Sequence, residues 1–256
     1  MALMRAVDFL MAAQGEDGLW CEDAVSAEIL MAFAATDFHG EFARVQPVYR
    51  QGLAALVARR EKIPPLVMSH LIRLLNRDAR RGSGVLAAVN IAHENTLCFQ
   101  GNEIAVPFRP SLEAAVQLLA GPQSASSKTS VVDVGECAAL LDALFLVDAS
   151  MEQISGVIQR MRVGGSPTGV AVAYSAEKKR PNAMSVLEMS PEMLYWYSRA
   201  WFPFEDPPGR NWRNDVVIHL LETQTYDGGW GGQALPLTVR LRFTAFAMQT
   251  IILARW

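Results

Sequence analysis

The sequence predicts an all-α protein built from stacked helical hairpins. Over most of its 256 residues, apolar side chains recur at intervals of three and four, the spacing that gives a helix an apolar face. Strand signals are limited to a short alternation at residues 170–174, which no second strand follows. One turn sequence, Q-x-x-D-G-x-W, occurs near both ends of the chain, and a repeated unit is typical of folds that stack similar hairpins.

The expected helices follow one another along the whole chain. Residues 1–14 form a mature helix and not a signal peptide, because an acidic residue interrupts the apolar stretch. Ser190 and Pro191 make a helix start, with the serine as N-cap and the proline at the first helical position. The other expected helices are rich in Ala, Leu and Met or are amphipathic, and cover residues 24–38, 48–60, 66–77, 112–120, 138–147, 151–162, 211–222 and 244–255.

The connections between these helices are short. Residues 82–110 hold one expected helix at 86–99, and residues 121–129 and 164–169 are loops by composition. None of them resembles a long interdomain linker, so residues 1–256 are expected to form a single domain of roughly ten to twelve helices.

Composition limits the class of protein. Hydrophobic residues make up 51% of the chain, and this excess has to line an apolar cavity or a patch that touches a membrane. The 23 basic and 26 acidic residues give no reason to expect a nucleic-acid partner. Cys21, Cys98 and Cys137 lack the spacing of a disulfide framework or a zinc site, so a protein of the reducing cytoplasm is expected. No apolar run reaches the roughly 20 residues that cross a bilayer, so any membrane association is expected at the surface of the protein.

The repeated turn carries the most specific local signal. A leucine precedes each glutamine by four residues, so the glutamine should close a helix. The glycine allows the left-handed backbone of a helix ending, the tryptophan returns its ring to that helix end, and an Ala-rich helix follows. If the two turns belong to the first and last hairpins, closing a ring would make them neighbours. The shared residues are Gln14, Asp17, Gly18 and Trp20 in the first turn (residues 14–20), and Gln224, Asp227, Gly228 and Trp230 in the second (residues 224–230).

The second turn, QTYDGGWGG, followed by TAFAMQTIILA, resembles the QW motif of squalene-hopene and oxidosqualene cyclases. The wider group includes class II diterpene cyclases and the β subunits of protein prenyltransferases. The resemblance implies an α/α barrel of inner and outer helices around an apolar cavity. Family cyclases usually carry two barrels, whereas this chain has room for one, so it is similar to a single-domain class II terpene cyclase. Such turns report fold and not chemistry.

In the family, an aspartate at the start of an inner helix protonates an alkene or epoxide. Residues 130–144 here read SVVDVGECAALLDAL, and the resemblance assigns Asp133 as the acid and Glu136 as its hydrogen-bonding partner. The acidic motif of the family is DCTAE or DxDD. If the segment is aligned with DCTAE, Asp133 takes the position of the acid. If it is aligned with DxDD, Gly135 takes that position, which argues against activity. Apolar flanks would raise the pKa of Asp133 and keep it protonated. The alternative makes the same pair an N-cap and its capping-box partner.

Aromatic side chains would form the wall for carbocations, since ring faces stabilise cations without quenching them. Trp196, Tyr197 and Trp201 are the candidates, although an aromatic stripe is also common in a packed core. Asp133 and Cys137 are four apart and do not match the prenyltransferase zinc set, so neither metal nor cofactor is expected.

The sequence thus predicts proton-initiated cyclisation of a linear isoprenoid or meroterpenoid by a monomer or homodimer. Three arginines at 77, 80 and 81 are candidates for its head group, or form a solvated basic edge. The alternatives are a non-catalytic isoprenoid-binding barrel and a partner-dependent, prenyltransferase-like subunit.

Overall fold

The computed structural model describes residues 1–36, 42–59, 185–201 and 211–254, with isolated helical positions between 67 and 74 and between 152 and 158. Of this part of the chain, 76% is helical and none is strand, which confirms the all-α prediction. The chain divides into two compact units, Met1–Ala55 with Tyr174–Trp256, and Leu56–Ala173. Most described residues belong to the first unit. The features predicted at 86–99, 112–120, 121–129, 138–147, 164–169 and 170–174 lie outside the described residues.

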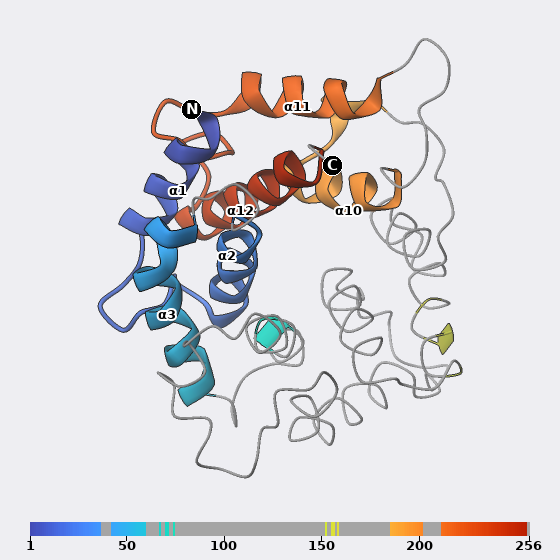
Figure 1. Ribbon diagram of the computed structural model, residues 1–256. Coiled ribbons are helices and arrows are strands. Elements are labelled where there is room, and N and C mark those ends of the chain that lie inside the picture. Colours follow the sequence, from blue (N-terminus) through green and yellow to red (C-terminus); the bar gives the residue numbers. More distant parts are fainter. Residues whose placement is uncertain are drawn as a thin grey trace. The chain divides into compact units, whose positions relative to one another are not determined.

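Helix α12 is the centre of the first unit (Figure 1). It packs against α1, α2, α10 and α11. Both α12 and α2 are buried on nearly all sides, as expected of helices inside a large core. The described helices are α1 (Ala2–Ala12), α2 (Asp23–Ala35), α3 (Phe42–Ala58), the 3-10 turn η4 (Val186–Glu188), α10 (Pro191–Trp201), α11 (Trp212–Thr223) and α12 (Leu237–Ala254).

Two predicted helix starts are wrong. Helix α3 begins at Phe42 and not at residue 48, because Pro47 lies inside the helix and does not mark its boundary. Helix α12 begins at Leu237 and not at residue 244, directly after Pro236. A proline that precedes a helix or lies near its start is compatible with helical backbone, so both helices extend further towards their N-termini than the sequence predicted.

The predicted helix start at Ser190 is confirmed. The Ser190 hydroxyl accepts a hydrogen bond from the backbone N–H of Met193 at 3.3 Å, and Pro191 is the first residue of α10. Asn211 caps α11 in the same way, accepting from the N–H of Asn214 at 3.0 Å. These caps fix where the two aromatic-bearing helices begin.

The helices of this unit form two rows. Helices α10, α12 and α2 form the inner row, since α12 packs against both of the others. Helix α10 runs parallel to α12, because Glu192 contacts Arg242 and, one turn further along both helices, Trp196 contacts Phe246. Helices α11, α1 and α3 form the outer row, which the contacts of the two repeated turns connect (Figure 1).

By length and composition alone, α12 could cross a membrane, and it is the single described helix of which this is true. However, 61% of it is buried inside the protein, against four other helices. A core helix of a water-soluble protein has the same properties, and the packing of α12 agrees with that interpretation.

Candidate functional site

The first turn joins three helices. The Gln14 side-chain N–H group donates to the carbonyl of Gly18 within the turn at 2.8 Å and to that of Val48 on α3 at 3.0 Å. The Trp20 indole N–H donates to the carbonyl of Leu10 at 2.6 Å, and this carbonyl in the last turn of α1 also accepts from the N–H of Ala13 at 3.2 Å. The predicted return of the tryptophan ring to the preceding helix end is confirmed.

The second turn repeats these contacts on the other end of the chain. Gln224 donates to the carbonyl of Gly228 at 2.9 Å and to that of Ala2 on α1 at 3.0 Å. The Trp230 indole N–H donates to the carbonyl of Leu220 at 2.7 Å. The glutamine that follows α11 therefore binds α1 in the same way as the glutamine that follows α1 binds α3. The prediction that the first and last hairpins are neighbours is confirmed.

Each turn depends on a glycine with left-handed backbone. Gly18 has φ +85° and Gly228 has φ +94°. A side chain on Gly228 would also overlap the backbone carbonyl of Arg5. The sequence placed the left-handed residue at the helix ending, which is wrong: α1 and α11 end at Ala12 and Thr223, and the residues directly after them keep negative φ. The glycines are required instead by the tight turn and by the close approach of the neighbouring helix, α3 at Gly18 and α1 at Gly228.

A hydroxyl residue in the following helix completes each turn. The N–H of Trp20 donates to Ser26 Oγ at 2.8 Å, and that of Trp230 to Thr244 Oγ1 at 3.0 Å. Each hydroxyl donates in turn to the carbonyl four residues earlier. Ser26 and Thr244 are thus equivalent positions. Because α2 begins three residues before Ser26 and α12 begins seven residues before Thr244, α12 is longer than α2 at its N-terminal end. Sequence analysis missed the two hydroxyl residues, although Ser-Ala and Thr-Ala occupy matching places in the two helices.

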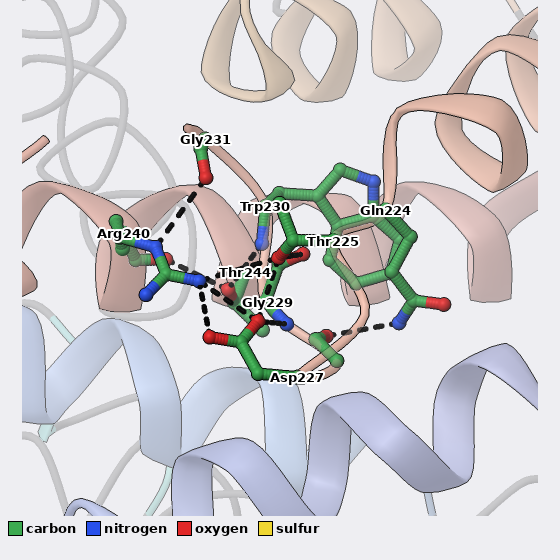
Figure 2. A network of polar contacts seen from close by, with 9 residues as sticks. Gln224, Thr225, Asp227, Gly229, Trp230, Gly231, Arg240 and Thr244 are labelled. Atoms are coloured by element: carbon green, nitrogen blue, oxygen red, sulfur yellow. Dashed lines mark hydrogen bonds and ion pairs between the residues drawn. The ribbon is translucent and has the colours of Figure 1, made fainter. Parts of the chain in front are cut away.

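The second turn also contains an ion pair that we call the arginine clasp, formed by Arg240, Asp227 and Thr225 (Figure 2). Arg240 Nη2 lies 2.9 and 2.8 Å from the two Asp227 carboxylate oxygens and 3.2 Å from Thr225 Oγ1. Its Nε donates to the carbonyl of Gly231 at 3.3 Å, and its guanidinium lies 5.0 Å from the ring centre of Phe9 on α1. The clasp therefore holds both the turn and the neighbouring helix.

Asp227 is a structural carboxylate. Burial alone would raise its pKa, but hydrogen bonds from Thr225 and Arg240 and from the N–H of Gly229, with the charge of Arg240, outweigh this effect and lower the pKa below its usual value. Asp227 is consequently ionised at neutral pH and cannot act as a proton donor there.

The two predicted acids, Asp133 and Glu136, lie outside the described residues, as do Cys98 and Cys137. Cys21 is described and has a free, exposed thiol. Among the residues that the structure describes, no three His, Cys, Asp or Glu side chains gather as metal ligands would.

The three predicted aromatic residues are described, and α10 divides them between two faces. Tyr197 and Trp201 stack with ring centres 5.9 Å apart and planes inclined by 19°. Both also contact Trp212 of α11, at 4.9 and 5.3 Å. Tyr197 and Trp201 are four residues apart and share one face of α10, and their rings fill the core between α10 and α11.

Trp196 lies on the face of α10 that meets α12. Its ring centre is 4.7 Å from Tyr195 and 6.2 Å from Phe246, and the Arg199 guanidinium lies 5.2 Å from it. We call Tyr195, Trp196 and Phe246 the inner aromatic group. The Trp196 indole N–H is buried, and in the described part of the chain no atom accepts a hydrogen bond from it.

A part-buried charge cluster, which the sequence did not reveal, joins the three inner helices. Arg242 Nε of α12 lies 3.1 Å from the Glu28 carboxylate of α2, and Nη2 lies 3.3 Å from Glu192 of α10. Arg242 also lies over the ring of Phe246, at 5.7 Å. Glu28 is only 2% exposed, and a buried carboxylate requires such a partner. The available signal was a glutamate inside an otherwise apolar helix.

Comparison with protein-family models, with curated proteins and with solved structures finds no match. The resemblance to the cyclase group accordingly depends on the two turns and on the helices that surround them.

Proposed function

We propose that the protein is a single α/α barrel with class II terpene cyclase activity, in which a carboxylic acid starts the cyclisation of a linear isoprenoid or meroterpenoid. The observation that supports the barrel most directly is the repeated glutamine contact. Gln224 binds the carbonyl of Ala2 on α1 as Gln14 binds that of Val48 on α3. Hairpins that contact their neighbours in one uniform way, including last to first, are the parts from which a closed ring is made.

In such a barrel the inner helices α10, α12 and α2 line the chamber. The inner aromatic group would then contribute apolar wall, while Tyr197 and Trp201 would hold that wall against α11 from behind. A wall of this kind excludes water, so a cationic intermediate survives until it loses a proton.

Asp133 would supply the proton and Glu136 would orient it. A neutral carboxyl group in an apolar chamber transfers its proton to a terminal alkene carbon, or to an epoxide oxygen whose C–O bond then opens. Internal double bonds attack the resulting cation, and loss of a proton from a final C–H bond balances the proton that the acid supplied. The substrate and product have the same mass. The protonation step needs neither metal nor organic cofactor.

The test uses the full chain with linear C15 and C20 isoprenoids and their terminal epoxides, followed by gas chromatography and mass spectrometry. Wild-type protein is expected to give cyclic isomers of unchanged mass. Asp133→Asn is expected to lower the rate by roughly 100-fold or more, because it removes a general acid. Asp215→Asn, at an exposed position in the first turn of α11, is the matched control and keeps full activity. Undiminished turnover by Asp133→Asn would refute Asp133 as the acid.

The second candidate is a non-catalytic isoprenoid-binding barrel, which Gly135 in the acid position of the DxDD register favours. It predicts tight binding of a prenyl chain by the wild type with no product. A third, a prenyltransferase-like subunit, predicts stoichiometric zinc and obligate co-purification with a helical partner. We place the protein in the cytoplasm, with peripheral contact to the membrane that supplies its apolar substrate, and as a monomer or homodimer.

A further inference from the structure

We infer that the protein forms a homodimer through an exposed apolar surface beside the second turn, with two-fold symmetry that brings the same surface of two copies together. This surface, which we call the seam patch, consists of Met4 of α1, Ile218 and Leu221 of α11, and Tyr226 of the turn. The inference does not depend on the proposed function, because it concerns exposed residues and applies equally to a cyclase and to a binding barrel.

The seam patch surrounds the contact between the last and first hairpins. Gln224 donates to the carbonyl of Ala2 at 3.0 Å, so the start of α1 lies beside the end of α11 (Figure 1). The four residues of the patch lie within about two helical turns of this contact. Tyr226 is 81% exposed, and the other three side chains are 46% to 47% exposed. Tyr and Met are enriched in protein–protein interfaces.

The two turns can be compared position by position. They lie 210 positions apart in the sequence. The helices that accept their glutamine bonds, α3 and α1, correspond with an offset of 46 positions, as the acceptor carbonyls of Val48 and Ala2 show. The carbonyls that approach the two turn glycines, those of Gln51 and Arg5, are also 46 positions apart. Each residue of the seam patch therefore has a defined counterpart beside the first turn.

Three positions of the seam patch change from charged to apolar in this comparison. The residues exposed beside the first turn are Asp8, Glu16 and Arg50, and their counterparts beside the second turn are Ile218, Tyr226 and Met4. The glutamine, tryptophan and glycine contacts are the same at both turns, so the turn itself does not require apolar side chains at these places. Apolar side chains gathered at exposed positions indicate a surface that another molecule covers.

The charges beside the seam patch fit a second copy of the chain. The exposed Arg5 guanidinium donates to the neutral side-chain oxygen of Gln224 at 2.7 Å, and Glu222 at the end of α11 is also exposed. In a dimer with two-fold symmetry, each contact between two different residues occurs twice. Arg5 of each copy can then pair with the partner's Glu222, while Met4 lies against the partner's Ile218.

A membrane fits this surface less well. Surfaces that bind anionic bilayers combine apolar side chains with several Lys or Arg residues. Beside the seam patch, α11 carries the exposed acids Asp215 and Glu222, against the exposed Arg5 of α1. The predicted basic edge at residues 77, 80 and 81 belongs to the other compact unit and lies outside the described residues. The charge beside the patch therefore favours a protein partner.

The association state of the full chain is measured by sedimentation velocity. Wild-type protein should change from monomer to dimer between about 1 and about 200 µM, the range of affinity expected of a small interface. The test variant gives the patch its first-turn residues through Ile218→Asp, Tyr226→Glu and Met4→Arg, and should weaken the dimer at least about 10-fold. Because equivalent backbone already carries these residues beside the first turn, the variant should fold, as circular dichroism checks.

A charge reversal tests the ion pair between the copies. Glu222→Arg places two like charges opposite each other and should weaken the dimer roughly 10-fold, and adding Arg5→Glu should restore most of the affinity. Ala12→Arg is the matched control, since Ala12 is exposed at the place beside the first turn that corresponds to Glu222. It should leave the dimer unchanged.

A wild-type monomer over the whole concentration range, or a dimer that the triple variant leaves intact, would overturn the inference. A monomer that binds vesicles of phosphatidylcholine and phosphatidylserine through the patch would assign the surface to a membrane and overturn the dimer as well. Product formation is scored separately, so a failure of the dimer and a failure of the proposed cyclase are distinguishable.

Discussion

The arginine clasp of the second turn makes a measurable contribution to stability. We consider Asp227→Asn, Arg240→Leu and the double variant; leucine retains part of the apolar packing of the arginine stem against Phe9. Exposed ion pairs contribute about 0.2–1 kcal/mol, whereas hydrogen bonds to charged groups contribute about 1.5–3 kcal/mol. The Arg240 side chain is 10% exposed and that of Asp227 is 28% exposed, so solvent screening is partial. We expect a coupling energy of about 1–2 kcal/mol.

The coupling is measured by urea denaturation of the four proteins, followed by circular dichroism, in a double-mutant cycle. Each single variant should lose more stability than the coupling alone, because it leaves the other partner part-buried without its counter-charge.

The two turns share the aspartate contact but not the arginine. Asp17 accepts from the N–H of Leu19 at 3.1 Å, as Asp227 accepts from that of Gly229 at 3.2 Å. The position equivalent to Arg240 is Glu22. A coupling below about 0.5 kcal/mol between Asp227 and Arg240 would refute the clasp as a stabilising pair.

Three further predictions concern the same unit. The pKa of Asp227 is lower in the folded protein than in the unfolded chain, where it is about 4. Its contribution to the free energy of unfolding should therefore be complete above that value and should disappear as the pH falls through the folded pKa. Urea denaturation at decreasing pH should show this loss of stability, and Asp227→Asn should remove the part that Asp227 contributes. Gly228→Ala should cost about 2 kcal/mol or more by thermal melting, since the left-handed backbone and Arg5 oppose a side chain, while Gly232→Ala, with open space, should stay within about 0.5 kcal/mol. Trp201→Ala should cost about 3–5 kcal/mol by urea denaturation, because its ring is buried between two helices.

The features that the sequence predicted correctly are those that depend on residues close together in the chain. Ser190 and Pro191 specify a helix start within three residues, and the structure has it there. Each of the two turns depends on residues within seven consecutive positions, so their shared geometry follows from their shared residues. The neighbouring positions of the first and last hairpins could be predicted because one turn type, used twice, has to make the same contact twice.

The features that the sequence did not reveal depend on partners far apart in the chain. Arg242 pairs with Glu28 at a separation of 214 residues, and the apolar pattern of neither helix predicts which residue of the other helix it will contact. Trp196 and Tyr197 are adjacent in sequence, yet a helical step of about 100° sends one towards α12 and the other towards α11. Composition could identify them as aromatic but could not divide the inner wall from the core behind it.

The glutamine contacts of the two turns close loops of very different length. The glutamine bond of the first turn closes 34 residues, and that of the second closes 222. With a closure cost that grows as (3/2)RT ln n, the longer loop costs at most about 1.7 kcal/mol more. Arg240 pairs with Asp227 inside one hairpin, so that pairing stabilises the turn itself. The Arg240 guanidinium also lies 5.0 Å from the ring centre of Phe9 on α1, which joins the last hairpin to the first. A cation–π contact contributes roughly 0.5–2 kcal/mol, so this contact offsets part of the additional closure entropy.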